Sequence, residues 1–314
     1  MKRALLSIGF LFTLCVSSLH AQLFCSIFGG VGSDNAYDVL AIADSGFVVA
    51  GSTNTYGAGG NDFYVLKYNK SGSIQWTKTI GDFGNEVAYG ISVATNGDYI
   101  IAGETNSLGN GGDVYVARLT SAGNLLWTRS VGGNGSDYSR EITSTTDNGC
   151  AVIATTGSYG HGGDDAYVIK LDSNGVVQWN IAIGDVNTDG GQGILASSDG
   201  NIVVAGRCFP ATGGAQLLVT KLDYSGTILF SNYYSSHDAF DFFVASDIVE
   251  TNGDYVISGY CDTSGGSNKN SFLTSITTAG VHNWTRIIGI AGNDNGYGME
   301  KTSDGGRTYD EPEA

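Results

Sequence analysis

The sequence predicts an all-β fold built from repeats, and three observations support this prediction. A large aromatic residue recurs about every 52 residues. These residues are Trp76, Trp127, Trp179, Phe230 and Trp284. The apolar runs are four to eight residues long, rich in Val, Ile and Tyr, and bounded by Gly, Asn, Asp and Ser, as in strands joined by hairpins. No segment after residue 21 shows apolar residues at helical spacing.

Each repeat contains four such runs. In the first repeat they begin with the alternating segment 36–42 and the apolar segment 47–51, which a tight turn joins. A Gly-rich loop then ends at Asp62, and the run 64–67, a Ser-Gly turn and a last run that contains Trp76 follow. Four short antiparallel strands in a repeat of this length form one blade of a β-propeller. A large aromatic residue in each blade would pack against the neighbouring blade.

The repeats divide the chain into consecutive units. Their ranges are 29–80, 81–131, 132–183, 184–234 and 235–288, with a partial unit at 289–306. The segment from Phe24 to Gly29 matches Trp76 to Gly81, so we expect a lone outer strand at the start. The sixth blade would contain this strand and a first strand at 296–302. We therefore predict five complete blades and a partial sixth, with a non-repeat tail at 307–314 and a truncated or frame-shifted end.

The first 21 residues have the pattern of a secretory signal peptide. Lys2 and Arg3 precede an apolar run over residues 4–16, and the segment 17–20 leads to a cleavage site after Ala21. The run is short for a membrane span, so we expect none in the mature chain. We expect a secreted or cell-surface protein, with the periplasm as an alternative, and a monomer.

The charge of the chain argues against nucleic acid as a partner. The formal net charge is -16 at pH 7, and removal of Lys2 and Arg3 leaves 13 − 31 = −18. Such an acidic surface repels phosphate backbones. Among the cysteines, Cys208 and Cys261 occupy the same position in successive units. They could form a bridge between blades or simply fill two strand ends, and we favour the second interpretation because equivalent points on adjacent blades diverge.

Two series of acidic residues recur with the repeat. The first lies five residues after the start of a unit: Asp34, Glu86, Asp137, Asp189 and Asp294. The second closes the Gly-rich loop: Asp62, Asp113 and Asp165, with Gln216 and Asn270 in the fourth and fifth units. In a four-stranded meander both loops lie at the same end of the blade, so we expect both series to line one rim of the ring.

These carboxylates have two main interpretations. They could accept hydrogen bonds from loop N–H groups and fix the loops. Alternatively, they could bind Ca²⁺, which prefers six to eight oxygen ligands. We favour the structural role, because Gln216 and Asn270 replace the acid in two units. Catalysis by a carboxylate pair would require one blade to differ from the others, and no such blade stands out.

The pattern Gly-Gly-x-Asp-x-Tyr-Val-x-Lys-Leu-Asp-x-x-Gly-x-x-x-Trp is most complete from Gly163 to Trp179. It resembles the β-propeller repeats of secreted bacterial surface proteins of the SBBP type, over roughly Phe24 to Gly306. The Gly-x-x-x-Trp part also resembles the blade-docking motif of quinoprotein-like propellers, whose enzymatic members have eight blades and a quinone. From that resemblance we carry over only the packing role of the aromatic residues, Phe24 included, and expect no cofactor.

These observations lead to an expectation for function. We expect an exported, non-catalytic propeller that acts as a binding or scaffolding module for an unknown protein or glycan. An enzyme acting on extracellular polysaccharide and a calcium-dependent adhesin are the alternatives.

Overall fold

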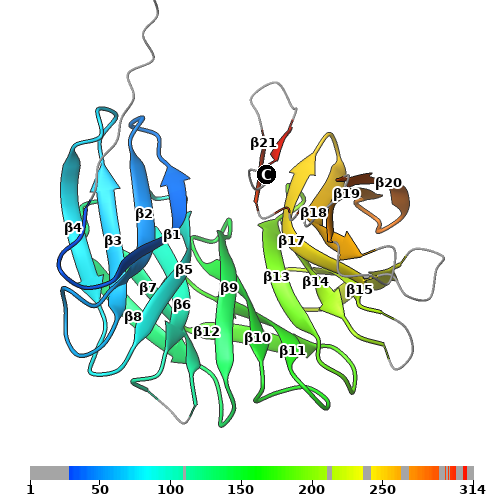
Figure 1. Cartoon of the computed structure of the whole chain (residues 1–314), viewed down its shortest axis with the longest axis horizontal. Helices are drawn as coiled ribbons and strands as arrows, with labels where there is room; N and C mark the ends of the chain where they lie inside the picture. The colour runs from blue at the N-terminus through cyan, green and yellow to red at the C-terminus, as the bar shows by residue number, and fades with distance from the viewer. Residues whose placement is uncertain are drawn as a thin grey trace, which may run out of the picture.

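The computed structural model of the chain describes residues 28–108, 111–210, 214–235, 242–262, 269–289, 294, 296, 298–301 and 307–309. It confirms the predicted fold class. Within these residues the fold is all-β, and five four-stranded antiparallel sheets form the five blades of a propeller. The blades follow one another in chain order around an arc (Figure 1).

Every blade is a simple meander in which strands pair in sequence order. Blades one and two contain β1 (Asp34–Ala41), β2 (Phe47–Thr53), β3 (Asp62–Tyr68), β4 (Ile74–Ile80), β5 (Glu86–Val93), β6 (Tyr99–Thr105), β7 (Asp113–Leu119) and β8 (Leu125–Val131). Blade three contains β9 (Asp137–Ser144), β10 (Cys150–Thr156), β11 (Asp165–Leu171) and β12 (Val177–Ile183). Blades four and five contain β13 (Gly190–Ala196), β14 (Ile202–Cys208), β15 (Gln216–Leu222), β16 (Ile228–Tyr234), β17 (Phe242–Thr251), β18 (Asp254–Asp262), β19 (Asn270–Thr277) and β20 (His282–Ile288).

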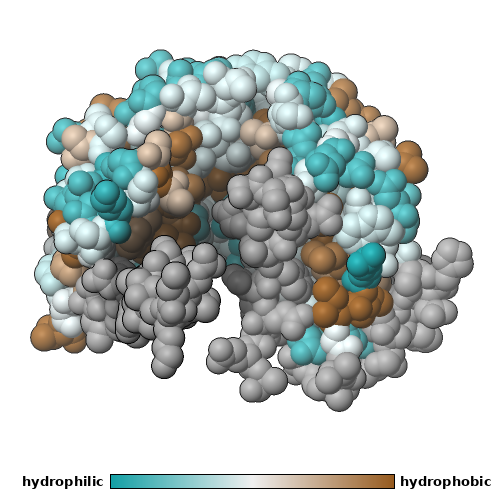
Figure 2. Space-filling view, turned by 90° about the horizontal axis from the view of Figure 1, so that it is seen from above, coloured by the Kyte–Doolittle hydropathy of each residue, from teal (hydrophilic) through white to brown (hydrophobic). Residues whose placement is uncertain are grey.

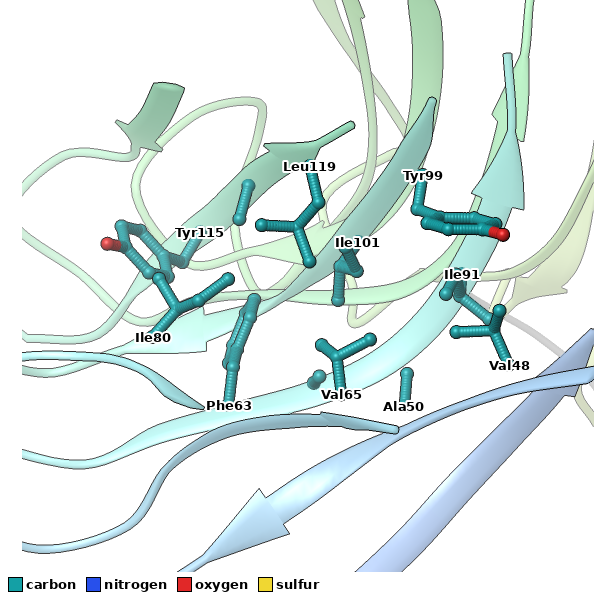
Figure 3. Close-up of a cluster of buried hydrophobic side chains, with 12 residues drawn as sticks. Val48, Ala50, Phe63, Val65, Ile80, Ile91, Tyr99, Ile101, Tyr115 and Leu119 are labelled. Carbon is teal, nitrogen blue, oxygen red and sulfur yellow. The ribbon is translucent and has the colours of Figure 1, made fainter. Parts of the chain in front are cut away.

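Neighbouring blades bury their apolar faces against each other. Between blades one and two, Phe63 and Val65 of β3 face Ile101 of β6 (Figure 3). All three side chains are fully buried. Because burial contributes roughly 25 cal/mol per Å² of apolar surface, these contacts are the main source of cohesion between blades. The β-branched residues of the middle strands fit this role, because their stiff side chains pack well on a pleated surface.

The repeated aromatic residue of one blade packs on a glycine of the next. A Cβ atom on Gly123 would lie 2.8 Å from the ring of Trp76, and Gly175 has the same relation to Trp127. Both glycines turn the chain at positive φ, 83° and 76°, where other residues are strained. Gly226 lies in the same way on Trp179, and Gly280 on Phe230. The glycine of Gly-x-x-x-Trp therefore receives the aromatic ring of the preceding blade.

The two ends of a blade differ in their connections. We call the end with the loop between the second and third strands and the link to the next blade the loop end. The end with the two tight turns, between the first and second strands and between the third and fourth strands, is the turn end. At the turn end, four cations on the third strands pair with acids of the turns between the first and second strands. These pairs are Lys67–Asp44, Arg118–Asp98, Lys170–Asp147 and Lys221–Asp199.

The C-terminal part contains a two-stranded sheet of β21 (Met299–Lys301) and β22 (Arg307–Tyr309). The β21 strand lies against β17 of blade five, and it is shorter than the first strand we predicted at 296–302. The β22 strand lies in the segment that we expected to be a non-repeat tail. Phe24 and the predicted signal peptide lie outside the described residues. Among the described residues, no helix is long and apolar enough to cross a bilayer.

Candidate binding site

The structure brings the two predicted acidic series together in pairs at the junctions between blades. Each pair joins a third-strand acid of one blade to the first-strand acid of the next. The pairs are Asp62 with Glu86, Asp113 with Asp137, and Asp165 with Asp189. All six side chains are buried. Both series lie at the loop end as expected, and the six paired carboxylates are enclosed in the junctions between blades.

The glycine that begins the second, third and fourth units lies between the two carboxylates of a junction. A Cβ on Gly81 would be 2.2 Å from Asp62 Oδ1 and 2.5 Å from Glu86 Oε2. At Gly184 the corresponding distances to Asp165 Oδ1 and Asp189 Oδ2 are 1.8 and 2.5 Å. No side chain fits at such distances, so the close approach of the two carboxylates explains why these units start with glycine.

The acids fix the loops that precede them. The N–H four residues earlier donates to the carboxylate in both series: Gly30 to Asp34 over 2.7 Å, and His161 to Asp165 over 2.8 Å. Hydroxyl groups at the end of the second strand add to this, because Thr53 donates to Asp34 and Thr105 to Glu86. These contacts are those that the structural interpretation requires.

The junctions between the described blades concentrate negative charge. Burial and the neighbouring Glu86 raise the pKa of Asp62 to about 6. Burial also raises the pKa of Asp113 and of Asp165, and the facing acid contributes in both cases. Within the described residues, the Oδ1 atoms of Asp113, Asp137 and Asp165 are buried and have no hydrogen-bond partner.

A second group of residues lines the axis of the ring, and the sequence did not reveal it. The first strand of every blade contains a β-bulge at the same place, where one residue has no partner on the second strand. A bulge turns its side chain away from the regular alternation. The five bulged residues are Tyr37, Tyr89, Arg140, Gln192 and Ser246. We call them the bulge residues.

All five bulge residues line one cavity of about 630 Å³ at the centre of the ring. Figure 2 shows the described blades curving around this central hollow. Tyr37 and Tyr89 pack edge to face with ring centroids 5.3 Å apart, and half of the surface of Tyr37 is exposed. The Tyr89 hydroxyl donates to Glu104 over 2.9 Å, which holds its ring in place. Arg140 is exposed, and its guanidinium lies 4.9 Å from the centre of the Tyr138 ring.

Three carboxylates form the floor of this cavity. Asp38, Glu141 and Asp247 each follow a bulge residue and line both the large cavity and a second one of about 400 Å³. The same position is occupied by Gly90 in blade two and by Gly193 in blade four. Acid and glycine therefore alternate around the axis from blade to blade.

Each floor carboxylate accepts a hydrogen bond from the backbone of the element that follows its blade, which is the next blade for Asp38 and Glu141 and β21 for Asp247. Ile91 N–H donates to Asp38 Oδ2 over 2.8 Å, and Met299 N–H donates to Asp247 Oδ2 over 2.7 Å. Ile194 N–H donates to Glu141 Oε2 over 2.8 Å. The glycines give these contacts room, since a Cβ on Gly193 would lie 3.1 Å from the Cα of Asp247. Asp38 and Glu141 thus each join two neighbouring blades, and Asp247 joins blade five to β21.

The floor is negatively charged and partly enclosed. Burial raises the pKa of Glu141 well above its usual range, and the charges of Asp247 and Asp38 add to this effect. Asp38 and Asp247 each accept a further bond from the following N–H, over 2.7 and 2.6 Å. Glu141 therefore holds a proton more readily than an ordinary glutamate does.

Comparisons with known proteins support the fold and extend no further. A family model described as a β-propeller domain of unknown function, DUF5122, matches residues 48–74 and 95–125. This match indicates a β-propeller repeat protein. No curated protein matches the chain in sequence.

Two solved structures resemble the chain at low sequence identity. The WD40 domain of Neurospora crassa Pan2 has a TM-score of 0.54 and 10% identity, covering 87% of this chain and 71% of that one. The periplasmic gluconolactonase PpgL of Pseudomonas aeruginosa has a TM-score of 0.51 and 14% identity, covering 84% and 74%. At such identities the likeness concerns the fold alone.

Proposed function

We propose that the protein is an exported binding module whose ligand enters the axial cavity lined by the bulge residues. The observation that carries this proposal is a contrast within the repeat. Strand pairing, loop acids and aromatic anchors recur from blade to blade, whereas the bulge position changes from Tyr to Arg, Gln and Ser. A position that projects into a cavity and varies among the blades suits recognition better than construction of the ring.

The chemistry of the cavity favours a carbohydrate. Two tyrosine rings offer flat apolar surfaces for the C–H face of a sugar, and Gln192 and Arg140 offer amide and guanidinium donors for hydroxyl groups. A cavity of about 630 Å³ is within the range of small-ligand sites, which suits one or two sugar rings. Export is consistent with the N-terminal pattern ending at Ala21.

A glycan array with the purified chain tests this proposal. Wild-type protein should retain a set of oligosaccharides that the double variant Tyr37→Ala, Arg140→Ala no longer binds. The matched control replaces an aromatic residue and an arginine outside the cavity, Phe83→Ala with Arg286→Ala, and should bind as wild type does. Binding that is equal in all three proteins, or binding of peptides in place of glycans, would contradict the proposal.

The floor carboxylates favour one alternative, an enzyme that acts on polysaccharide. Glycoside hydrolysis uses a protonated carboxyl group and an ionised one on either side of the scissile bond. Glu141, with its raised pKa, and Asp38 or Asp247 would fill these roles. Incubation of bound oligosaccharides with wild-type protein and with Glu141→Gln separates the two functions. Turnover that this single change abolishes, with binding retained, would establish the enzyme.

A further inference from the structure

We propose that the junction between blades three and four binds one zinc-class divalent cation through Asp185, Asp189 and the Cys208 thiolate. One ligating atom from each of these three residues lies within 4.8 Å of the others. Asp189 and Cys208 are buried, and Asp185 is half-buried at the surface, where an ion can reach it. No comparable group of three lies elsewhere in the described residues.

A second observation points to the same place. The Asp165 side chain is fully buried, and its Oδ1 has no hydrogen-bond partner among the described residues. This oxygen lies 1.8 Å from where a Cβ on Gly184 would be, and Asp189 Oδ2 lies 2.5 Å from the same point. The two oxygens are thus at most 1.8 + 2.5 = 4.3 Å apart. A buried carboxylate oxygen directed at another carboxylate is stabilised either by a proton or by a positive charge near it, and a divalent cation supplies that charge.

The junction between blades three and four differs from the other junctions in one potential metal-ligating atom, the sulfur of Cys208. The second strand ends in Thr53, Thr105 and Thr156 in blades one to three, but in Cys208 in blade four. A thiolate with carboxylates suits zinc and similar ions better than Ca²⁺ or Mg²⁺, which prefer oxygen alone. Zinc ligands bond at about 2.0–2.3 Å, so a contraction of about 1 Å from the present spacing would complete the site.

Metal binding would also change the state of the thiol. A coordinated thiol loses its proton, so a bound zinc ion would hold Cys208 as the thiolate. The carboxylates keep their loop contacts, since Asp185 N–H and Phe209 N–H use one lone pair on each Asp189 oxygen.

Calorimetric titration of metal-free protein with ZnCl₂, CaCl₂ and MgCl₂ tests the site. We expect one zinc per chain, with clearly weaker binding of the other two ions. Cys208→Ser should weaken zinc binding by at least about tenfold, since even loss of an outer-shell partner has that effect. Cobalt should give a thiolate charge-transfer band in the wild type and none in this variant.

The chain offers a matched control in Cys261. Cys261 holds the same strand position in blade five. The residue that pairs with it on the first strand is Phe243, whereas blades one to three have an acid at that place. Cys261→Ser should leave zinc binding and the cobalt band unchanged. Zinc binding that Cys208→Ser leaves intact, equal affinity for Ca²⁺, or no binding by a folded wild type would each overturn the proposal. These outcomes are independent of glycan binding in the axial cavity.

Discussion

The loop end and the turn end of the blades hold their charged groups in opposite ways. At the loop end, carboxylates face carboxylates, as in Asp62 and Glu86, and the pKa of Asp62 is raised to about 6. At the turn end, carboxylates face cations, and Lys221 with other hydrogen bonds lowers the pKa of Asp199 to about 2. The turn end is therefore stabilised by its charges at neutral pH, whereas the loop end holds its charges at a cost.

This difference indicates that the two ends serve different purposes. The ion pairs of the turn end reach the next blade, since Arg118 donates to the carbonyl oxygens of Asn148 and Ser173. The turn end thus fixes how blades are placed. The loop end retains unfavourable contacts, and such contacts are common where a protein binds ligands or ions. Five substitutions should distinguish the two ends by how strongly each one changes the free energy of unfolding.

The largest effect should come from Gly184→Ala at the loop end. The new methyl group would lie 1.8 Å from Asp165 Oδ1, so both carboxylates must move. We expect a loss of about 4 kcal/mol in the free energy of unfolding, measured by denaturant titration. Gly200→Ala at the turn end is the control, because a Cβ there meets no atom within 4 Å and only its φ of 84° is strained. It should cost about 1 kcal/mol. Equal losses would mean that the carboxylates do not meet.

The next effect should come from Lys170→Met at the turn end. Its ammonium group is fully buried and bonded to Asp147 over 2.8 Å. Removal of the cation leaves the carboxylate half-buried beside apolar surface, and we expect a loss of about 3 kcal/mol. The loss should shrink as the pH falls and Asp147, whose pKa is lowered in the folded protein, becomes protonated. A loss that does not depend on pH would show that packing of the lysine stem is responsible.

A third change, Asp62→Asn, should stabilise the protein at neutral pH. Because the folded pKa of Asp62 is raised from 3.8 to about 6, wild type loses stability as the pH rises through this window. Asparagine removes that loss and keeps an oxygen for the Ala58 N–H. We expect the variant to gain about 1–2 kcal/mol in the free energy of unfolding at pH 7 and nothing at pH 4. Thermal melting at the two pH values measures this difference.

Asp199→Asn at the turn end is the opposite case. Its pKa is lowered, so its contribution is present above pH 3.8 and is lost as the pH falls towards 2. The asparagine variant should be less stable than wild type at pH 7, and the two should converge in acid. If both asparagine variants shift stability in the same direction at pH 7, the contrast between the ends is wrong.

The smallest effect should come from Lys67→Met. Its partner Asp44 is half exposed, and the two atoms are 3.3 Å apart. Exposed pairs contribute little, so we expect less than about 1 kcal/mol. The difference from Lys170→Met measures how much burial, and not pairing itself, determines the strength of the turn end. A loss equal to that of Lys170→Met would contradict this interpretation.

The sequence predicted the blades because each carries its own local signals. The turn glycines, the alternating first strand and the aromatic anchor recur in every unit, and Trp76 and Trp127 mark the period without any structure. The acids of the loop end were also predicted, because they repeat. Their pairing across the junction was not predicted, since it depends on how one blade lies against the next.

The axial site was missed because its signal lies outside the simple repeat. A bulge shifts the alternation by one residue, so Tyr37 and Asp38 looked like ordinary members of an alternating strand. The floor acids recur in every second blade, at Asp38, Glu141 and Asp247. A search at twice the repeat length would have found them. The bulge residues vary among the blades, so a search for repeats could not have found them.

The bulge position also makes the ring a ready scaffold for engineering. Tyr37, Arg140 and their equivalents stand outside the register of strand pairs, so new side chains there leave the ladders intact. A library randomised at these five positions would vary one cavity while the blades keep their own sequences. In such a library, ligand recognition could be selected without changes in folding. Few natural pockets allow this separation.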